Sequence, residues 1–475
     1  MSAPACLRAG SRALIALLGG AAIAFAAPAA ARAMSIERVV SPGGIEAWVV
    51  SDRTLPLIAV EFAFLGGADQ DPLDKPGIAD MASSLLDEGA GPFDANAFHD
   101  RLERKAIELS FRTGRDYLRG TLRTLNESRD EAFDALRLAL AEPRFDPAAV
   151  ERERAQIMSR LRRETLSPND MANRTWWATA FPGHPYGLPV NGTLESVPNI
   201  TIEDLKSHTR RALARDNVKI AVVGDIDAAT AGKLIDRTFG ALPAKADLTP
   251  VAPVVPQGLG RRVVVPLDVP QAVVEFGGPG IARSDPDFMA AYIVNHILGG
   301  GAFSSRLYLE VREKRGLAYG ISDSLVWLNR TALLLGHTAT RADVTGQTLE
   351  IIEREIRRLA EEGPSEDEFT KAKTYLKGSF ALGLDTSNRI ASQLVQMQTD
   401  NLGIDYIERR VGLIDAVTLA DAKRVAKRLL AGGLLVTIVG RPEGVTSSES
   451  AAGGSPGPLA KPRGDTPAGR ETEQR

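Results

Sequence analysis

Two sets of side chains in this 475-residue sequence have the types and spacing to do chemistry. Asp80, Ser83 and Ser84 lie at positions i, i+3 and i+4 of a segment with helical periodicity, so they share one helix face. Arg312 is the second and Tyr319 the last residue of the run Val-Arg-Glu-Lys-Arg-Gly-Leu-Ala-Tyr. Both side chains can donate hydrogen bonds to a carbonyl oxygen that gains negative charge. On residue chemistry alone, a solvated surface explains both sets as well as a functional site does, because polar faces and charge runs usually coat a fold.

Other residue types that bind metals are sparse. Cys6 is the only cysteine, and it lies in the N-terminal segment described below. No histidine lies at the i, i+3 or i+4 spacing that helix-borne ligand pairs show. We therefore expect five histidines to be structural or surface residues, namely His99, His184, His208, His296 and His337.

The elements that must position these residues follow a repeated order. Apolar strand patterns at 57–64 and 218–225 open and close a first segment, and patterns at 272–277 and 434–441 do the same for a second. The opening and closing strands start 161 residues apart in the first segment and 162 in the second. Helices are expected between them at 77–88, 148–165, 284–298 and 365–383. The matched order predicts an internal duplication and hence two tandem homologous α+β domains.

Changes in composition mark the boundaries of these domains. Arg8 and Arg12, an apolar stretch and Ala31-Arg32-Ala33 are typical of a secretory signal peptide over residues 1–33, with an uncleaved anchor as the alternative. The Pro-rich residues 243–260 predict a linker between an N-terminal domain at 34–242 and a C-terminal domain at 261–444. Residues 445–475 are rich in Ser, Gly and Pro, and we expect a disordered tail.

Charge and cysteine content exclude several classes of function. The formal net charge of −3 becomes −6 when the signal peptide, with three Arg and no acidic residue, is removed. Nucleic-acid sites usually come with a basic excess, so we expect no nucleic-acid partner. A mature chain without cysteine has no thiol chemistry and no zinc–thiolate site. We expect a periplasmic or secreted protein without a membrane span in the mature chain.

At the level of motifs, the sequence resembles the insulinase/pitrilysin family of zinc peptidases over about residues 37–442. The blocks that carry the resemblance are Gly77-Ile78-Ala79, Glu151–Arg154, His184–Gly187, Ile202–Leu205, Asn217–Asp225, Leu298–Gly301, Ser304–Leu307 and Val311–Tyr319. The resemblance implies that each half is a mainly antiparallel sheet covered by helices, and that two halves form a clam-like cavity. In the family, an H-x-x-E-H helix and a later Glu bind Zn²⁺ and activate water.

This chain departs from the family at the metal site. The resemblance places Asp80, Ser83 and Ser84 at the three motif positions, and the third ligand falls near Arg160, while Glu153 stays acidic. Serine is a poor zinc ligand and arginine repels the ion, which prefers about four N, S or O ligands. We therefore expect a degenerate zinc site with no metal in this chain.

Arg312 and Tyr319 match a pair that, in the family, binds the peptide backbone and stabilises the oxyanion at the zinc site of another domain. The resemblance thus predicts a metalloendopeptidase-family subunit that is inactive alone, and it leaves open whether the chain itself is an enzyme. A zinc-bearing sister subunit would supply the metal, and the substrate would be a peptide or unfolded protein. The alternatives are a non-catalytic scaffold or peptide-binding protein and, with least support, an independent zinc peptidase. Neither the peptide, the partner nor the choice between heterodimer and homodimer follows from the sequence.

Overall fold

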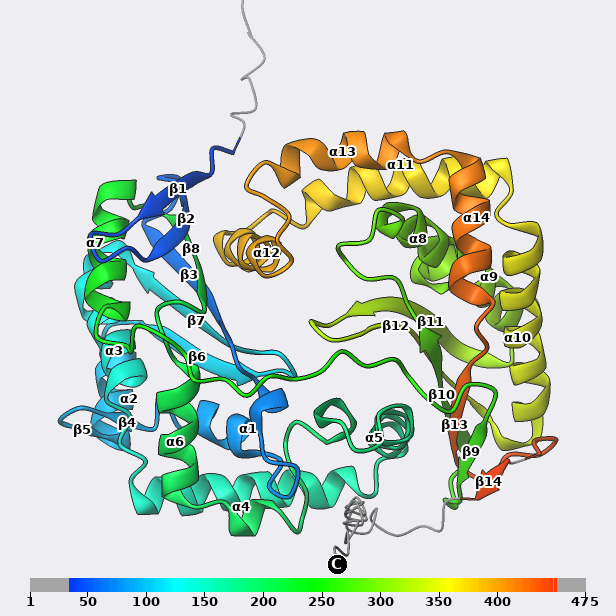
Figure 1. Ribbon diagram of the computed structural model, residues 1–475, viewed down its shortest axis with the longest axis horizontal. Helices are drawn as coiled ribbons and strands as arrows, with labels where there is room; N and C mark the ends of the chain where they lie inside the picture. The colour runs from blue at the N-terminus through cyan, green and yellow to red at the C-terminus, as the bar shows by residue number, and fades with distance from the viewer. Residues whose placement is uncertain (1–33, 447, 451–475) are drawn as a thin grey trace, which may run out of the picture. The chain divides into compact units, whose positions relative to one another are not determined.

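Two six-stranded sheets carry the fold of this computed structural model, one in each half of the chain (Figure 1). The structure describes residues 34–446 and 448–450. The first sheet has the strand order β1-β2-β8-β3-β7-β6 and the second β11-β12-β10-β13-β9-β14. The strands are β1 (Glu37–Val40), β2 (Glu46–Ser51), β3 (Leu57–Leu65), β6 (Glu108–Thr113), β7 (Tyr117–Leu125), β8 (Val218–Gly224), β9 (Arg262–Val265), β10 (Gln271–Pro279), β11 (Ala318–Trp327), β12 (Ala332–Arg341), β13 (Leu435–Val439) and β14 (Glu449–Ser450), with β4 (Gly89–Ala90) and β5 (Phe93–Asp94) forming a separate small hairpin.

Helices fill the sequence between the strands of each half. Those of the first half are α1 (Ile78–Ser83), α2 (Ala95–Arg104), α3 (Arg129–Ala141), α4 (Pro147–Glu164), α5 (Pro168–Ala180), α6 (Ile202–Ala212) and α7 (Ala228–Phe239). Those of the second half are α8 (Phe288–Asn295), α9 (Arg306–Tyr308), α10 (Thr345–Glu362), α11 (Glu366–Leu382), α12 (Ser387–Thr399), α13 (Tyr406–Ala416) and α14 (Leu419–Leu430), together with π-helical turns at His296–Gly300 and Leu309–Glu313.

The two sheets share one design. Strands β6-β7-β3-β8-β2 of the first correspond in order to β11-β12-β10-β13-β9 of the second, and most neighbours in both are antiparallel. In each central strand a phenylalanine ring lies over a glycine of the next strand. A Cβ atom added to Gly120 would lie 2.1 Å from the ring of Phe62, and one added to Gly336 would lie 2.2 Å from the ring of Phe276. The predicted α+β class with two homologous halves is therefore confirmed.

Each half lends a helix to the sheet of the other. Helix α12 of the second half packs on β3 and β8, and α5 of the first half packs on β10 and β13 (Figure 1). Gln398 of α12 donates to the carbonyl oxygen of Ile220 at 2.9 Å, and the indole of Trp176 in α5 donates to that of Leu435 at 3.1 Å. Separate apolar cores lie within the two halves, and the exchanged helices add contacts that neither half can make alone.

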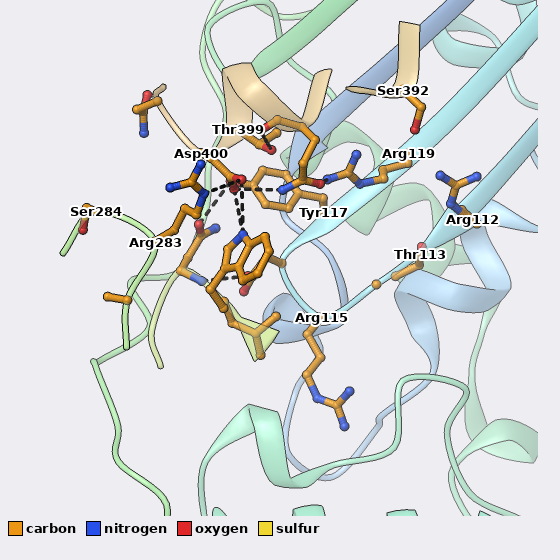
Figure 2. A pocket seen from close by; sticks show the side chains of 18 residues that line it. Arg112, Thr113, Arg115, Tyr117, Arg119, Arg283, Ser284, Ser392, Thr399 and Asp400 are labelled. Atoms are coloured by element: carbon orange, nitrogen blue, oxygen red, sulfur yellow. Dashed lines mark hydrogen bonds and ion pairs between the residues drawn. The ribbon is translucent and has the colours of Figure 1, made fainter. Parts of the chain in front are cut away.

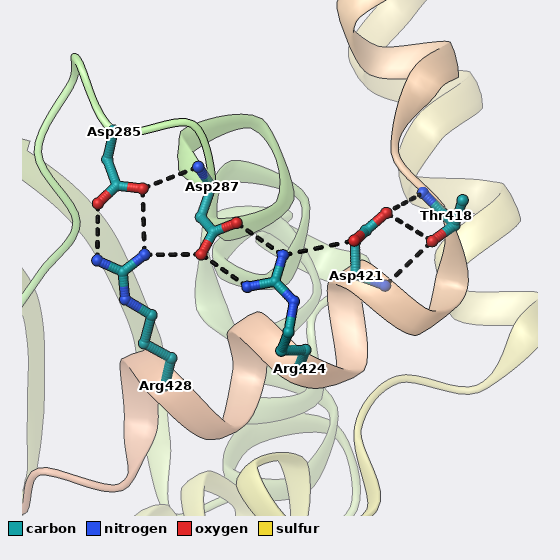
Figure 3. Close-up of polar contacts among 6 residues, drawn as sticks. All are labelled: Asp285, Asp287, Thr418, Asp421, Arg424 and Arg428. Carbon is teal, nitrogen blue, oxygen red and sulfur yellow. Dashed lines mark hydrogen bonds and ion pairs between the residues drawn. The ribbon is translucent and has the colours of Figure 1, made fainter.

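Helix α14 is tied to the loop that precedes α8 by a network of ion pairs (Figure 3). Arg428 contacts Asp285 at 2.7 Å and Asp287 at 2.6 Å, and Arg424 contacts Asp287 at 2.7 Å. Hydrogen bonds from the two guanidinium groups lower the pKa of Asp287 to about 2. Asp421 in turn contacts Arg424 and caps the start of α14, so the helix is fixed at both its first and middle turns.

The predicted linker has no regular secondary structure, whereas the start of the predicted tail pairs with a strand. Residues 243–260 contain no helix or strand. At the start of the expected tail, Ser448 donates a backbone hydrogen bond to Arg262, and β14 runs parallel to β9. The predicted signal peptide and the chain after Ser450 lie outside the described residues. Within the described residues, no helix is both long enough and apolar enough to cross a membrane.

Candidate functional site

Helix α1 carries the first candidate set, and a buried carboxylate holds its start. Gly77 has a φ of 103°, which turns the chain into the helix. Asp71 accepts hydrogen bonds from the backbone N–H groups of Gly77 at 2.7 Å and Ala79 at 2.9 Å. Burial raises the pKa of Asp71 to about 7, and these two N–H donors oppose that rise. The helix ends at Ser83, five residues before the predicted end at 88, because the chain continues in turns from Ser84.

The structure brings Asp80 and Arg160 together. A guanidinium nitrogen of Arg160 donates to the Asp80 carboxylate at 2.9 Å. Burial raises the pKa of Asp80, and the positive charge of Arg160 opposes that rise. The hydroxyls of Ser83 and Ser84 donate to the backbone carbonyl of Asp80 at 2.8 Å and 3.0 Å, so they satisfy the helix that bears them. Glu153 faces the same place, and burial raises its pKa.

These side chains do not fit a zinc ion. The guanidinium of Arg160 donates to one oxygen of the Asp80 carboxylate and brings a positive charge to the position of a ligand. Both serine hydroxyls are committed to backbone. Among residues 34–446 and 448–450 there is no group of three or more His, Cys, Asp or Glu side chains that could hold a metal. An ion pair across α1 and α4 thus stands where a metal would need anionic and neutral ligands.

Arg312 and Tyr319 meet in the second half. Arg312 lies in the π-helical turn Leu309–Glu313, and Tyr319 lies at the start of β11. The guanidinium carbon is 4.8 Å from the centre of the Tyr319 ring and 4.9 Å from that of Tyr308, so two aromatic faces hold it. Tyr319 is 87% exposed. In the part of the chain that the structure describes, the side chains of Arg312 and Tyr319 form no hydrogen bond and no ion pair, so their donors are open to a ligand.

A buried acid positions the glycine-rich turn beside this pair. Asp323 of β11 accepts a hydrogen bond from Asn295 at 2.6 Å, and its other carboxylate oxygen has no partner among the described residues. Burial raises its pKa well above the usual range, and the N–H groups of Gly299 and Gly300 oppose that rise. A Cβ at Gly299 would lie 2.8 Å from Asp323, so this close approach requires glycine. The turn is a π-helix that spans His296–Gly300.

A second buried contact fixes the element that bears Arg312. Arg306 of α9 is 8% exposed and holds the carboxylate of Glu368 in α11 through two hydrogen bonds of 2.6 Å and 2.7 Å. Hydrogen bonds from Arg306 help to lower the pKa of Glu368 to about 2 against the effect of burial. Arg315, in the same charge run as Arg312, contacts Glu310 at 2.6 Å. The run is therefore a paired cluster in which Arg312 alone faces aromatic rings.

The histidines lie apart from both sets. His208 is buried, and burial lowers its pKa to about 4. His296 stacks on Tyr375 with 4.9 Å between ring centres, and His337 lies 3.1 Å from the amide oxygen of Asn169. His184 accepts from the N–H of Tyr186, and His99 lies 3.8 Å from Glu88.

The structure also contains a polar cavity that the sequence did not predict (Figure 2). It has a volume of about 690 Å³ and lies where the β6–β7 hairpin of the first half meets the β11–β12 hairpin of the second, beside α12. Its lining includes Arg112, Arg115, Arg119 and Arg283. The only local signal is the run Arg112-Thr-Gly-Arg-Asp-Tyr-Leu-Arg119, because a hairpin over it pairs its first and last residues.

Known proteins share this fold and are similar to this chain in sequence. Residues 50–194 match the family model described as insulinase (peptidase family M16), and residues 199–376 match the model described as the peptidase M16 inactive domain. A non-peptidase homolog from Helicobacter pylori is 27% identical over 337 residues, which cover 70% of this chain and 77% of that protein. An uncharacterized zinc protease from Streptomyces coelicolor is 26% identical over 419 residues, covering 86% and 90%. A crystal structure of a peptidase M16 inactive domain from Pseudomonas fluorescens superposes with a TM-score of 0.81 at 26% identity, covering 88% and 100%.

Proposed function

Because the chain belongs to the insulinase (M16) family of peptidases, we propose that it is a family member inactive on its own that acts as a subunit. In this proposal it binds peptide and presents Arg312 and Tyr319 to the zinc site of a sister subunit. The names of two similar proteins, a non-peptidase homolog and an inactive M16 domain, support the first part. The proposal further has the chain exported to the periplasm, on the strength of its N-terminal sequence.

The observation that carries the proposal is the outward-facing Arg312–Tyr319 pair. Two rings contact the guanidinium, and the hydroxyl of the exposed Tyr319 forms no hydrogen bond among the described residues. Donors that are fixed before the substrate arrives stabilise a developing oxyanion without reorganisation. In the described chain, neither Arg312 nor Tyr319 forms a side-chain hydrogen bond or ion pair with α1 or α4. The pair therefore suits an oxyanion presented by a second polypeptide.

The absence of zinc from this chain is part of the proposal. It is supported by the Asp80–Arg160 ion pair, which neutralises the carboxylate that a metal would otherwise need. Elemental analysis of the purified, untagged mature chain should find less than about one tenth of a zinc ion per chain. One tightly held zinc per chain would overturn this part.

A non-catalytic scaffold or peptide-binding protein is the second candidate. The same ion pair favours it, because Asp80 and Arg160 stabilise the fold at the degenerate site without any metal. A scaffold predicts that Arg312 and Tyr319 affect partner binding or nothing at all. The subunit predicts that they affect turnover.

The test is turnover by the reconstituted complex with a sister subunit that bears an intact H-x-x-E-H motif. Tyr319→Phe keeps the ring under Arg312 and removes only the hydroxyl, so kcat should fall by about 10²–10³ with partner affinity unchanged. Arg312→Lys keeps the charge and removes the planar fork, and it should lower kcat similarly.

Tyr375→Phe is the matched control, because Tyr375 is also exposed and stacked on another ring, that of His296. This change should leave kcat within a factor of two. Equal, small effects of Tyr319→Phe and Tyr375→Phe would overturn the proposed role. Loss of partner binding in place of turnover would favour the scaffold.

A further inference from the structure

The cavity between the two hairpins carries an inference that rests on the proposed peptide binding. We propose that the arginine pair Arg112–Arg119 is a binding site for a carboxylate of the bound peptide, so that the chain selects acidic peptides. The carboxylate belongs either to an Asp or Glu side chain or to the C-terminus of the peptide. Nothing in this inference involves Arg312 or Tyr319.

Arg112 and Arg119 stand directly opposite each other on neighbouring strands. They are register partners in the antiparallel pair of β6 and β7. Like charges in this position destabilise a sheet, whereas opposite charges stabilise it. A pair further along the same face, beyond Ser110 and Thr121, shows the contrast: Glu108 is the register partner of Arg123 and accepts its hydrogen bonds at 3.3 Å.

Among the described residues, no carboxylate forms a hydrogen bond or ion pair with either arginine, although the charges of Glu61 and Asp400 act on Arg119. Arg119 donates to the side-chain oxygen of Gln396 at 2.8 Å, and Arg112 has no hydrogen-bond or ion-pair partner in the described chain. Burial and the charge of Arg112 lower the pKa of Arg119. The charges of both arginines lower the pKa of Glu61 on β3, but burial outweighs them and raises it overall. The Glu61 carboxylate accepts a hydrogen bond from Thr121 at 2.7 Å.

The acid nearest the cavity is already committed. Asp400 accepts from the indole of Trp327 at 3.1 Å and from Gln396 at 2.8 Å, and it lies 3.8 Å from Arg283 (Figure 2). Asp116, the other acid of the lining, accepts from the Tyr186 hydroxyl and from the N–H of Asn329. Both aspartates of the lining thus accept hydrogen bonds from other groups of the protein, and neither forms a hydrogen bond or ion pair with Arg112 or Arg119 in the described chain.

The cavity has the size and the position for a peptide. About 690 Å³ lies within the range that small-ligand sites occupy. Both hairpins line it, and they contact each other where the Tyr117 hydroxyl donates to Asn329 at 3.1 Å. Thr113, beside Arg112, donates to the carbonyl of Ala79 in α1 at 3.0 Å. A carboxylate here receives two charge-assisted hydrogen bonds and relieves the repulsion between the arginines.

The test uses the full mature chain and fluorescein-labelled, acetylated and amidated octapeptides that differ only in a central Glu-Glu or Gln-Gln. A third peptide has Gln-Gln and a free C-terminus. Fluorescence anisotropy should show that a peptide with a carboxylate binds at least about tenfold more tightly than the amidated Gln-Gln peptide. Preference for Glu-Glu identifies a side-chain carboxylate, and preference for the free C-terminus identifies a terminal one.

Three variants locate the site. Arg112→Gln and Arg119→Gln should each reduce the preference to less than threefold. Arg123→Gln removes the same charge from the same face of the sheet and should keep the preference. Arg112→Gln should also leave the melting temperature unchanged or raised, because it relieves like-charge repulsion and Arg112 is exposed.

Two results would overturn the inference. Equal affinity of the wild-type chain for all three peptides would refute the carboxylate site while leaving peptide binding in place. An equal loss of preference in Arg123→Gln would show general electrostatic attraction and no defined site. Failure of every peptide to bind at 1 mM would count against this inference and the peptide-binding proposal together, whereas the role of Arg312 and Tyr319 stands or falls on turnover.

Discussion

The pH dependence of stability that Glu275 causes can test whether helix α5 keeps water away from the face of the second sheet on which it packs. This glutamate lies on the central strand β10, is 7% exposed and accepts a hydrogen bond from Asn173 of α5 at 3.2 Å. Burial raises its pKa from an ordinary 4.5 to about 7. Glu61 has the same place on β3 of the first sheet, and burial raises its pKa as well.

The magnitude follows from this pKa. A tenfold change in an ionisation equilibrium is about 1.4 kcal/mol, so a carboxyl with a folded-state pKa of about 7 costs the folded state about 3 kcal/mol once it is ionised. The contribution to stability is complete below about pH 4.5 and is lost as the pH rises through 7. Between pH 5 and pH 8, Glu275 alone should therefore cost about 2–3 kcal/mol.

The assay is chemical denaturation of the wild-type chain and Glu275→Gln across pH 5 to 8. Other acids with raised pKa values, such as Asp71, titrate equally in both proteins and cancel in the difference. Any fixed cost of a buried amide cancels too, since it does not depend on pH. Glu275→Gln should gain about 2–3 kcal/mol relative to the wild type over this range. A difference that stays constant within 0.5 kcal/mol, a threshold of about one tenth of a typical domain's stability, would show that Glu275 is hydrated and that α5 does not seal this face.

Three further predictions concern other contacts. Arg160→Ala should lower the free energy of unfolding by about 1–2 kcal/mol, which is less than the cost of breaking a fully buried pair because Arg160 is 43% exposed. Denaturant titration should show that adding Asp80→Asn restores most of this loss. An unchanged stability of the Arg160→Ala variant would contradict the pairing. Gly299→Ala should cost about 1–3 kcal/mol by overpacking against Asp323 and lower the turnover of the complex, as thermal melts and peptide assays can measure. Asp287→Asn should be less stable than the wild type at pH 7. The stabilising contribution of a carboxyl with a lowered pKa is lost as the pH falls through that pKa. Acid titration by circular dichroism should therefore show that the difference in stability shrinks below pH 4 and vanishes below about pH 2.

Local patterns placed the four strands and four helices that they predicted, but most other elements of the fold were not predicted. The expected strands at 57–64 and 218–225 are β3 and β8, and the expected helix at 148–165 is α4 within one residue at each end. The expected helix at 284–298 begins four residues later, at Phe288, since Asp285 and Asp287 are held by α14 and not by helical turns. Periodicity reports which face of an element is apolar, so it fails where a distant side chain sets the boundary.

Pairings between distant segments lay beyond that reasoning. The sequence predicted that Asp80 and Arg160 replace metal ligands, but not that they bond to each other across 80 residues. The Arg112–Arg119 pair is close in sequence, yet its meaning depends on Gln396 and on the second hairpin, which only the folded chain brings near. Exchange of α5 and α12 between sheets leaves no local trace, because each helix shows only an apolar face and not which sheet it covers.

The packing of α5 on the second sheet also means that this helix is synthesised well before one of the strands that cover it. Trp176 emerges from the ribosome 259 residues before Leu435, the residue whose carbonyl it meets. At about 5–20 residues per second, α5 and its two tryptophans wait about 13–50 s without the sheet that buries them. Every nascent chain thus passes through a period in which this aromatic helix is available to chaperones or to other nascent chains, and a truncated product that ends before β13 never leaves it.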